Sequence, residues 1–189
     1  MNFKSKKIKI IVYNLVILIS FCLGFALHNP VMRIYHRIER EVKEYHHKKD
    51  IVDTTLSSIF NEQQVLGLQD EKIASQNLGK GLKILYFWSP QCGKCKEATV
   101  QIQKFERENI QPVTVYGIPI AYEKQEVRDY ITQHDVDWIQ LWGNIESKAN
   151  YELFAYFAVP EVWIVDKDNK VKKVLIGTDE INNINYKLP

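Results

Sequence analysis

The feature that most constrains the fold is a run of seven residues, Leu82 to Trp88, in which only Lys83 is charged. A strand this apolar is expected to be buried on both faces of a sheet. Such a strand needs covering layers on both sides, which favours an α/β domain. The break Gly79-Lys80-Gly81 precedes the run, and Ser89-Pro90-Gln91 closes it.

The rest of residues 51–189 alternates between strand and helix patterns, and we expect it to form one domain. Strands separated by helices and followed by a hairpin predict a mixed central sheet flanked by helices. The last dozen residues are expected to form a short helix or an irregular tail. The other expected strands are 64–68, 72–74, 113–118, 138–142, 162–165 and 171–176, and the expected helices are 92–109, 123–134 and 147–156.

The chemistry of the chain is concentrated at Cys92-Gly93-Lys94-Cys95, directly after the buried strand. The first thiol is expected at a helix N-terminus, where backbone N–H groups and the helix dipole stabilise a thiolate. Lys94 adds a positive charge, and Gly93 lets the turn close without steric cost. Cys92 is therefore expected to be the exposed nucleophile. Cys95, one turn further in, is expected to resolve a mixed disulfide formed at Cys92.

A zinc or copper site is the alternative for two cysteines at this spacing. Zinc sites of this kind usually need a second Cys pair or a Cys/His pair. Residues 51–189 hold no further cysteine, and their only histidine is His134, on a different expected helix. We therefore expect neither a metal nor another cofactor.

Two segments carry a family resemblance. Leu85-Tyr86-Phe87-Trp88-Ser89-Pro90-Gln91-Cys92-Gly93-Lys94-Cys95-Lys96 resembles the active-site strand and helix of the thioredoxin superfamily. Val159-Pro160-Glu161-Val162-Trp163-Ile164-Val165-Asp166-Lys167-Asp168-Asn169-Lys170 is similar to the stretch in which a cis-proline begins a strand that leads to a polar turn. The resemblance covers about residues 60–178. With an N-terminal anchor, it points to the TlpA/ResA-like subgroup of membrane-anchored thiol–disulfide oxidoreductases.

The resemblance implies a thioredoxin-like fold with Cys92, Cys95 and Pro160 as catalytic residues. Pro160 would be cis and pack against the dithiol, although a simple proline at the start of a strand is the alternative. The Val159 backbone would bind an extended substrate peptide. Trp88 would shield the dithiol and contact substrate, or else fill the core.

Several positions depart from the family pattern. Gln91 stands where a tryptophan is usual, and Tyr86 stands where thioredoxin has a buried acidic residue. Ala98 occupies the position of the glutamate of ResA-like proteins. Gly93, Lys94 and Glu97 are the expected redox-tuning residues, and Glu97, Glu161 or water would have to replace the missing proton acceptor.

The N-terminal region predicts a membrane anchor. Residues 10–27 hold no charge, which is close to the minimum length of a membrane span. Four lysines lie in residues 1–9, which favours a cytoplasmic basic tail and an uncleaved signal anchor. A cleaved signal peptide lacks a suitable small residue in Ala26-Leu27-His28, and Phe21 before Cys22 argues against a lipoprotein signal.

Residues 28–50 are expected to form an amphipathic stalk helix. Its apolar residues recur every three to four positions, and the helix would lift the domain off the membrane, associate with itself or serve as a solvated linker. A metal site at His46 and His47 is disfavoured because adjacent helix residues point in different directions. The apolar positions are Val31, Tyr35, Ile38, Val42 and Tyr45.

The charge distribution excludes a nucleic-acid-binding domain. Residues 1–50 carry ten Lys+Arg against four Asp+Glu, whereas residues 51–189 carry 15 against 19. The expected function is a plasma-membrane thiol–disulfide oxidoreductase with an extracytoplasmic domain, reducing disulfides of bacterial envelope proteins and recharged by a membrane electron donor. The alternative is a non-catalytic thioredoxin-fold module that binds a metal or a partner protein.

Overall fold

The computed structural model describes residues 3–57, 65–73, 78–121, 123–143 and 154–184, without the side chains of 3–13 and 16–28. These residues form two compact units, Met1–His46 and His47–Pro189. Each unit is described by itself below.

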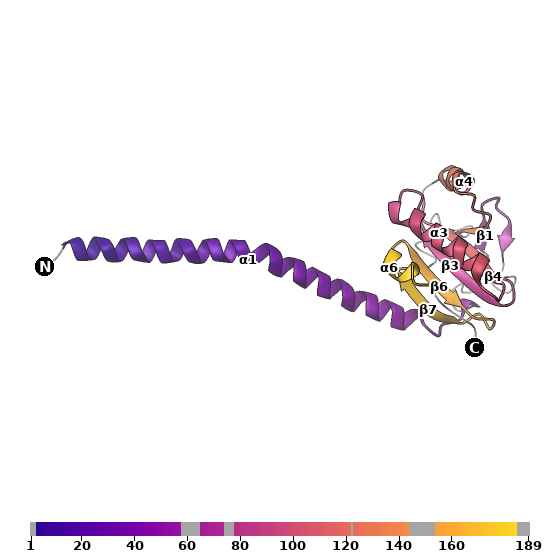
Figure 1. Cartoon of the computed structure of the whole chain (residues 1–189), viewed down its shortest axis with the longest axis horizontal. Helices are drawn as coiled ribbons and strands as arrows, with labels where there is room; N and C mark the ends of the chain where they lie inside the picture. Colours follow the sequence, from indigo (N-terminus) through magenta and orange to yellow (C-terminus); the bar gives the residue numbers. More distant parts are fainter. Residues whose placement is uncertain (1–2, 58–64, 74–77, 122, 144–153, 185–189) are drawn as a thin grey trace. The chain divides into compact units, whose positions relative to one another are not determined.

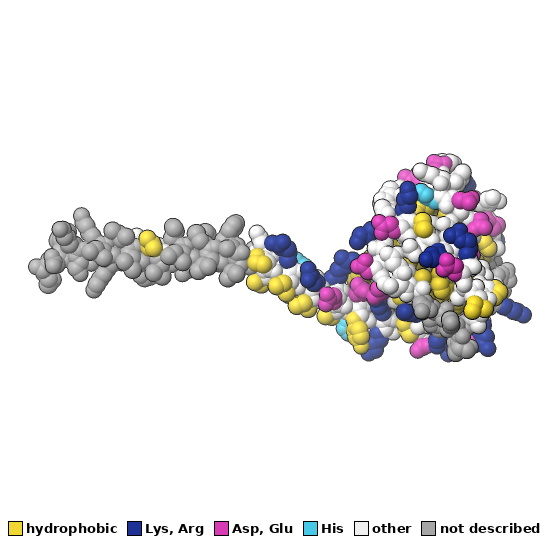
Figure 2. Space-filling view, in the orientation of Figure 1, with side chains coloured by type: hydrophobic (Ala, Val, Ile, Leu, Met, Phe, Trp, Pro, Cys, Tyr) yellow, Lys and Arg dark blue, Asp and Glu magenta, His cyan; other side chains and the backbone are white. Residues whose placement is uncertain are grey.

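The first unit consists of helix α1 (Phe3–Ile51), whose last turn belongs to the second unit. The helix continues through Pro30, so the predicted anchor and stalk lie in one helix. Between residues 31 and 45, half-exposed apolar side chains follow one side of it (Figure 2). Among the residues and side chains that are described, no helix has both the length and the hydropathy of a membrane span. The side chains of the predicted anchor, 10–27, lie outside that set except for Asn14 and Leu15.

The second unit is built on a seven-stranded mixed sheet with the order β2-β1-β5-β4-β3-β6-β7 (Figure 1). β3 pairs parallel with β4, which pairs parallel with β5, and the remaining pairings are antiparallel. The mixed sheet confirms the α/β part of the predicted fold class. The strands are β1 (Val65–Gly67), β2 (Lys72–Ile73), β3 (Leu82–Trp88), β4 (Val113–Pro119), β5 (Ile139–Gly143), β6 (Glu161–Val165) and β7 (Val171–Ile176).

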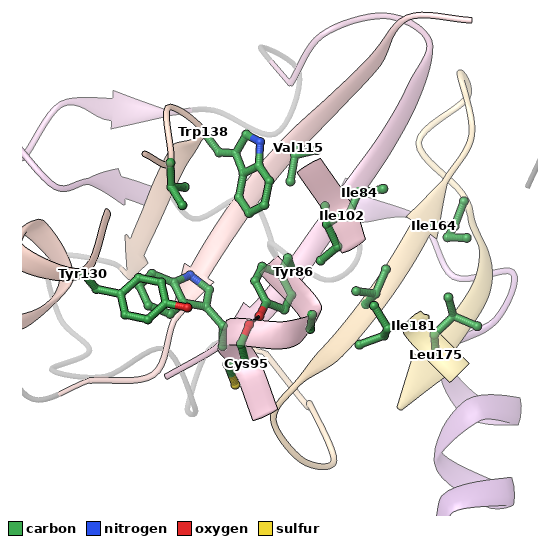
Figure 3. Packing of buried hydrophobic residues seen from close by; sticks show 14 of the residues in the cluster. Ile84, Tyr86, Cys95, Ile102, Val115, Tyr130, Trp138, Ile164, Leu175 and Ile181 are labelled. Carbon is green, nitrogen blue, oxygen red and sulfur yellow. Dashed lines mark hydrogen bonds between the residues drawn. The ribbon is translucent and has the colours of Figure 1, made fainter. Parts of the chain in front are cut away.

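In the described part of the chain, three helices follow strands of this sheet: α3 (Gly93–Glu108), α4 (Lys124–Gln133) and α6 (Gly177–Ile181). They contribute Ile102, Val127 and Ile181 to one apolar cluster, part of which Figure 3 shows. A second cluster on the opposite sheet face includes Ile51 from the end of α1 and Phe154. Most of the helix expected at 147–156 lies outside the described residues.

Strand β3 lies inside the sheet, between β4 and β6, and all seven of its side chains are buried. Even Lys83 is buried, because its Nζ donates to the carbonyls of Gly81 and Asp166 at 3.0 Å each. β6 runs antiparallel to β3 with Glu161 opposite Phe87. The start of β6 therefore lies beside the end of β3, where α3 begins.

Glu161, the first residue of β6, is a fully buried carboxylate with several partners. Its Oε1 lies 2.7 Å from His47 Nε2 and accepts a hydrogen bond from Trp163 Nε1 at 2.6 Å. Its Oε2 accepts hydrogen bonds from the backbone N–H groups of Phe157 and Ala158 at 2.7 and 3.3 Å. One carboxylate thus ties the end of α1 to the loop before β6.

We expect Glu161→Gln to lower the free energy of unfolding by about 3 kcal/mol, because an amide places N–H donors against N–H donors in a buried site. Glu180→Gln is the matched control. Glu180 also binds the end of α1, through Lys48 Nζ at 2.7 Å, but it is 40% exposed. Glu180→Gln should therefore lower the free energy of unfolding by less than about 1 kcal/mol. Urea unfolding followed by tryptophan fluorescence measures both, and equal losses would contradict this interpretation.

Candidate active site

The dithiol lies where β3 passes into α3. Cys92 is the N-cap of α3, with φ −88° and ψ 106°, and the helix starts at Gly93. The turn is closed by a hydrogen bond from Cys92 N to Ser89 O and one from Cys95 N to Cys92 O, both 3.0 Å. The structure thus confirms a thiol at the start of the helix. Both cysteines are free; Cys92 is half-buried and Cys95 is fully buried.

The surroundings of Cys95 hold it in its thiol form. Burial raises the pKa of Cys95 far above the usual thiol range, and a hydrogen bond with Cys92 raises it further. The Ser89 backbone and a hydrogen bond from Tyr86 act in the opposite direction on this pKa. Cys92, by contrast, is accessible and sits at the positive end of the helix dipole. The two thiols are therefore chemically unequal, as a nucleophile and a resolving thiol must be.

The segment before β6 lies against the dithiol. The Val159–Pro160 peptide bond is cis, as the resemblance implied. Cys92 Sγ donates to the Val159 carbonyl at 3.8 Å, and the carbonyl of the buried Pro160 accepts a hydrogen bond from Gly177 N at 2.9 Å. The structure therefore brings Cys92, Cys95, Val159 and Pro160 together from two strand ends far apart in the sequence.

A group of buried hydroxyls lies beneath Cys95, and it was not predicted from the sequence. Tyr86 Oη donates to the Cys95 carbonyl at 2.8 Å, and Thr99 Oγ1 donates to the same carbonyl at 2.9 Å. Thr99 Oγ1 also lies 3.3 Å from Tyr86 Oη and 3.2 Å from Tyr130 Oη. Figure 3 shows Tyr86 and Tyr130 pointing toward the helix turn that carries Cys95. Of these contacts, only that of Thr99 could be inferred from the sequence, because residues four apart, such as Cys95 and Thr99, are neighbours on a helix.

Trp88 does not face a substrate. It is 2% exposed, its Nε1 donates to Gln140 Oε1 at 3.2 Å, and its ring lies 4.4 Å from that of Tyr130. The predicted substrate contact of Trp88 is therefore not supported, because the side chain fills the core beneath the dithiol.

The expected redox-tuning residues line the exposed side of α3. Gly93, Lys94 and Glu97 are all exposed. The steric argument for Gly93 was wrong, because a Cβ there would meet nothing within 4 Å and its φ is not positive. Burial, the Cys92 thiol, the Ser89 backbone and Tyr86 shift the Cys95 pKa, whereas Lys94 and Glu97 are not among the causes of that shift.

Neither acidic candidate for proton acceptor lies beneath the thiols. Glu97 is on the surface of α3. Glu161 was a wrong expectation, because it binds Trp163 of the cluster on the other sheet face, opposite α3. Within the described part of the chain, no three His, Cys, Asp or Glu side chains gather as a metal site would require.

The raised pKa of Cys95 predicts unequal alkylation. A thiol with a raised pKa carries little thiolate at neutral pH, and its reactivity increases only as the pH approaches that pKa. Iodoacetamide at pH 7.5 should therefore modify Cys92 at least about tenfold faster than Cys95, with peptide mass spectrometry as the readout. Cys92→Ala tests Cys95 alone, and the same variant in guanidinium chloride is the control. Equal rates for Cys95 in the folded and unfolded protein would disprove the burial effect.

Comparison with known proteins agrees with this fold. Residues 81–171 match the thioredoxin-like family model. "Thioredoxin-like protein YneN" of Bacillus subtilis is 26% identical over 125 residues, covering 64% of this chain and 71% of that protein.

Solved structures share the fold. The thioredoxin domain of a thiol–disulfide oxidoreductase from Bacteroides vulgatus superposes with a TM-score of 0.52 at 16% identity, covering 64% of this chain and 87% of that one. DsbF of MTB, in its mixed oxidized and reduced forms, gives 0.54 at 18% identity, covering 69% and 96%. Residues 81–171 therefore form a thioredoxin-like domain, with the dithiol at the start of α3 and the cis-proline beside it.

Proposed function

We propose that this protein is a membrane-anchored oxidoreductase that reduces disulfides of envelope proteins through Cys92 and Cys95. The observation that carries the proposal is the inequality of the two thiols, one accessible at a helix N-terminus and one buried with a raised pKa. A thiol pair that only bound a metal would need both sulfurs as thiolates.

The reaction begins when the Cys92 thiolate attacks a substrate disulfide. One substrate sulfur leaves as a thiolate, and a mixed disulfide joins Cys92 to the other. Cys95 then attacks Cys92 Sγ, so that the Cys92–Cys95 disulfide forms and the second substrate sulfur leaves. The substrate gains two electrons and two protons, and the protein loses them. A membrane electron donor must return these electrons for the next turnover.

In this proposal the Val159 backbone holds the substrate. Its carbonyl lies 3.8 Å from Cys92 Sγ, so a peptide pairing with this segment would present its sulfur to Cys92. The reductive direction follows the TlpA/ResA-like resemblance rather than the geometry, which serves either direction.

The cellular location in this proposal is inferred from the N-terminal region. Residues 10–27 would cross the plasma membrane once, with the basic tail 1–9 in the cytoplasm. Residues 28–50 would form a stalk, and the thioredoxin-like domain of residues 51–189 would lie on the extracytoplasmic side. The uncharged stretch and the lysines before it support this arrangement.

Redox titration tests the activity. We expect the Cys92–Cys95 pair to have a reduction potential near or below about −250 mV, as reductases do, rather than about −120 to −180 mV. The protein should reduce insulin with dithiothreitol as the electron source, and Cys92→Ser should abolish this. Cys95→Ser should instead accumulate mixed disulfides. If no intramolecular disulfide forms in any thiol buffer, the protein is a binding module and not an enzyme.

Reporter fusions test the location. Alkaline phosphatase, active only outside the cytoplasm, should be active when fused after Pro189, whereas a cytoplasm-dependent reporter at the same position should be inactive. Replacing the four lysines of residues 1–9 by glutamine should weaken this orientation. The reverse pattern of activities would exclude an extracytoplasmic domain.

A further inference from the structure

We propose that the Tyr86 hydroxyl is a catalytic hydrogen-bond donor to the Cys95 sulfur when Cys95 resolves the mixed disulfide. The inference rests on the proposed thiol–disulfide exchange and names a residue that takes the place of the missing buried acid. Tyr86 would stabilise the attacking thiolate rather than accept its proton.

The fold fixes Tyr86 beneath the dithiol. Tyr86 lies in the middle of the buried strand β3, and its ring packs against Trp88 and edge-on against Trp138. Its hydroxyl reaches the first turn of α3, where it donates to the Cys95 carbonyl at 2.8 Å. A hydrogen bond from this hydroxyl also lowers the Cys95 pKa against the effect of burial. The hydroxyl thus lies close enough to the Cys95 thiol to affect its ionisation.

Thr99 leaves the Tyr86 hydroxyl free to change its acceptor. Thr99 Oγ1 donates to the Cys95 carbonyl at 2.9 Å, so this carbonyl keeps a donor when Tyr86 turns toward the sulfur. An unpaired buried carbonyl would otherwise oppose the change. Thr99 Oγ1 also lies 3.2 Å from Tyr130 Oη, and this contact helps to keep Thr99 in place.

The chemistry of the site makes Tyr86 a donor and not a base. Burial raises the pKa of Tyr86 well above its usual value, so the phenol stays neutral at physiological pH. In the described region, the titratable groups that act on Tyr86 are Cys92, Cys95 and Tyr130, and none is a carboxylate. A charged acceptor makes a hydrogen bond about twice as strong as a neutral one. The hydrogen bond from Tyr86 therefore becomes stronger as the Cys95 thiolate forms.

The resolving step balances without a protein base. The Cys95 thiol loses its proton to water, and its thiolate attacks Cys92 Sγ of the mixed disulfide. The Cys92–Cys95 bond forms, the bond from Cys92 to the substrate sulfur breaks, and the leaving thiolate takes a proton from water. Tyr86 donates to Cys95 until the new S–S bond removes the negative charge.

The aromatic disulfide DTNB separates the two steps in the full-length protein with Cys22→Ser. Attack by Cys92 releases one thionitrobenzoate, and attack by Cys95 on the mixed disulfide releases a second. We expect Tyr86→Phe, which keeps the ring, to slow the second release about tenfold or more and leave the first unchanged. The pH profile of the second release should shift to higher pH. Tyr130→Phe, which removes a hydroxyl of the same group that does not touch Cys95, is the matched control.

Thr99→Val provides an independent test. It removes the second donor to the Cys95 carbonyl, ties the Tyr86 hydroxyl there, and should also slow the second release. Unchanged kinetics in Tyr86→Phe, an equal effect on both releases, or an equal effect of Tyr130→Phe would each overturn the inference. Failure of the proposed function looks different, because the Cys22→Ser parent itself would then form no Cys92–Cys95 disulfide. Near-ultraviolet circular dichroism checks that each variant is folded.

Discussion

The pairing of β3 with β4 on one side and β6 on the other is the interaction on which the site depends. Because all seven residues of β3 are buried, the strand has one register in which its apolar faces are covered. That register sets Glu161 opposite Phe87. The segment after β3 therefore lies beside the segment before β6, at the same end of these two strands. This brings the dithiol and the cis-proline together.

Lys83 and Glu161, the two fully buried charged residues in the described part of the chain, both have hydrogen-bond partners. Lys83 is satisfied by two carbonyls, and Glu161 by two backbone N–H groups, an indole and an imidazole. The Cys95 thiol has weaker compensation, since burial raises its pKa while only hydrogen bonds from Ser89 and Tyr86 oppose the rise. A buried thiol with a raised pKa reacts only when a neighbouring group stabilises its thiolate form. The hydroxyls of Tyr86 and Thr99 lie where such a group must be.

Secondary structure was predicted better from the sequence than the contacts between distant residues. The strand patterns, the helix after Cys92 and the order of the elements follow from periodicity and turn residues, and the structure confirms those that fall within the described residues. The exposed side of α3 was interpreted less well, because sequence spacing placed Gly93, Lys94 and Glu97 near the thiols without showing which way they face. Trp88 was similarly ambiguous, since a tryptophan after a buried strand fits both a core and a binding surface.

The sequence by itself determined the chemistry: two thiols at the start of a helix, after a strand that must be buried on both faces. It also determined the resemblance that pointed to Pro160. Only the tertiary structure decided that His47 binds Glu161 across 114 positions and that Tyr86, Thr99 and Tyr130 gather beneath Cys95. These contacts join residues from different elements, and periodicity describes only the face on which a residue lies. Their partners are settled by the packing of the strands and helices that carry them.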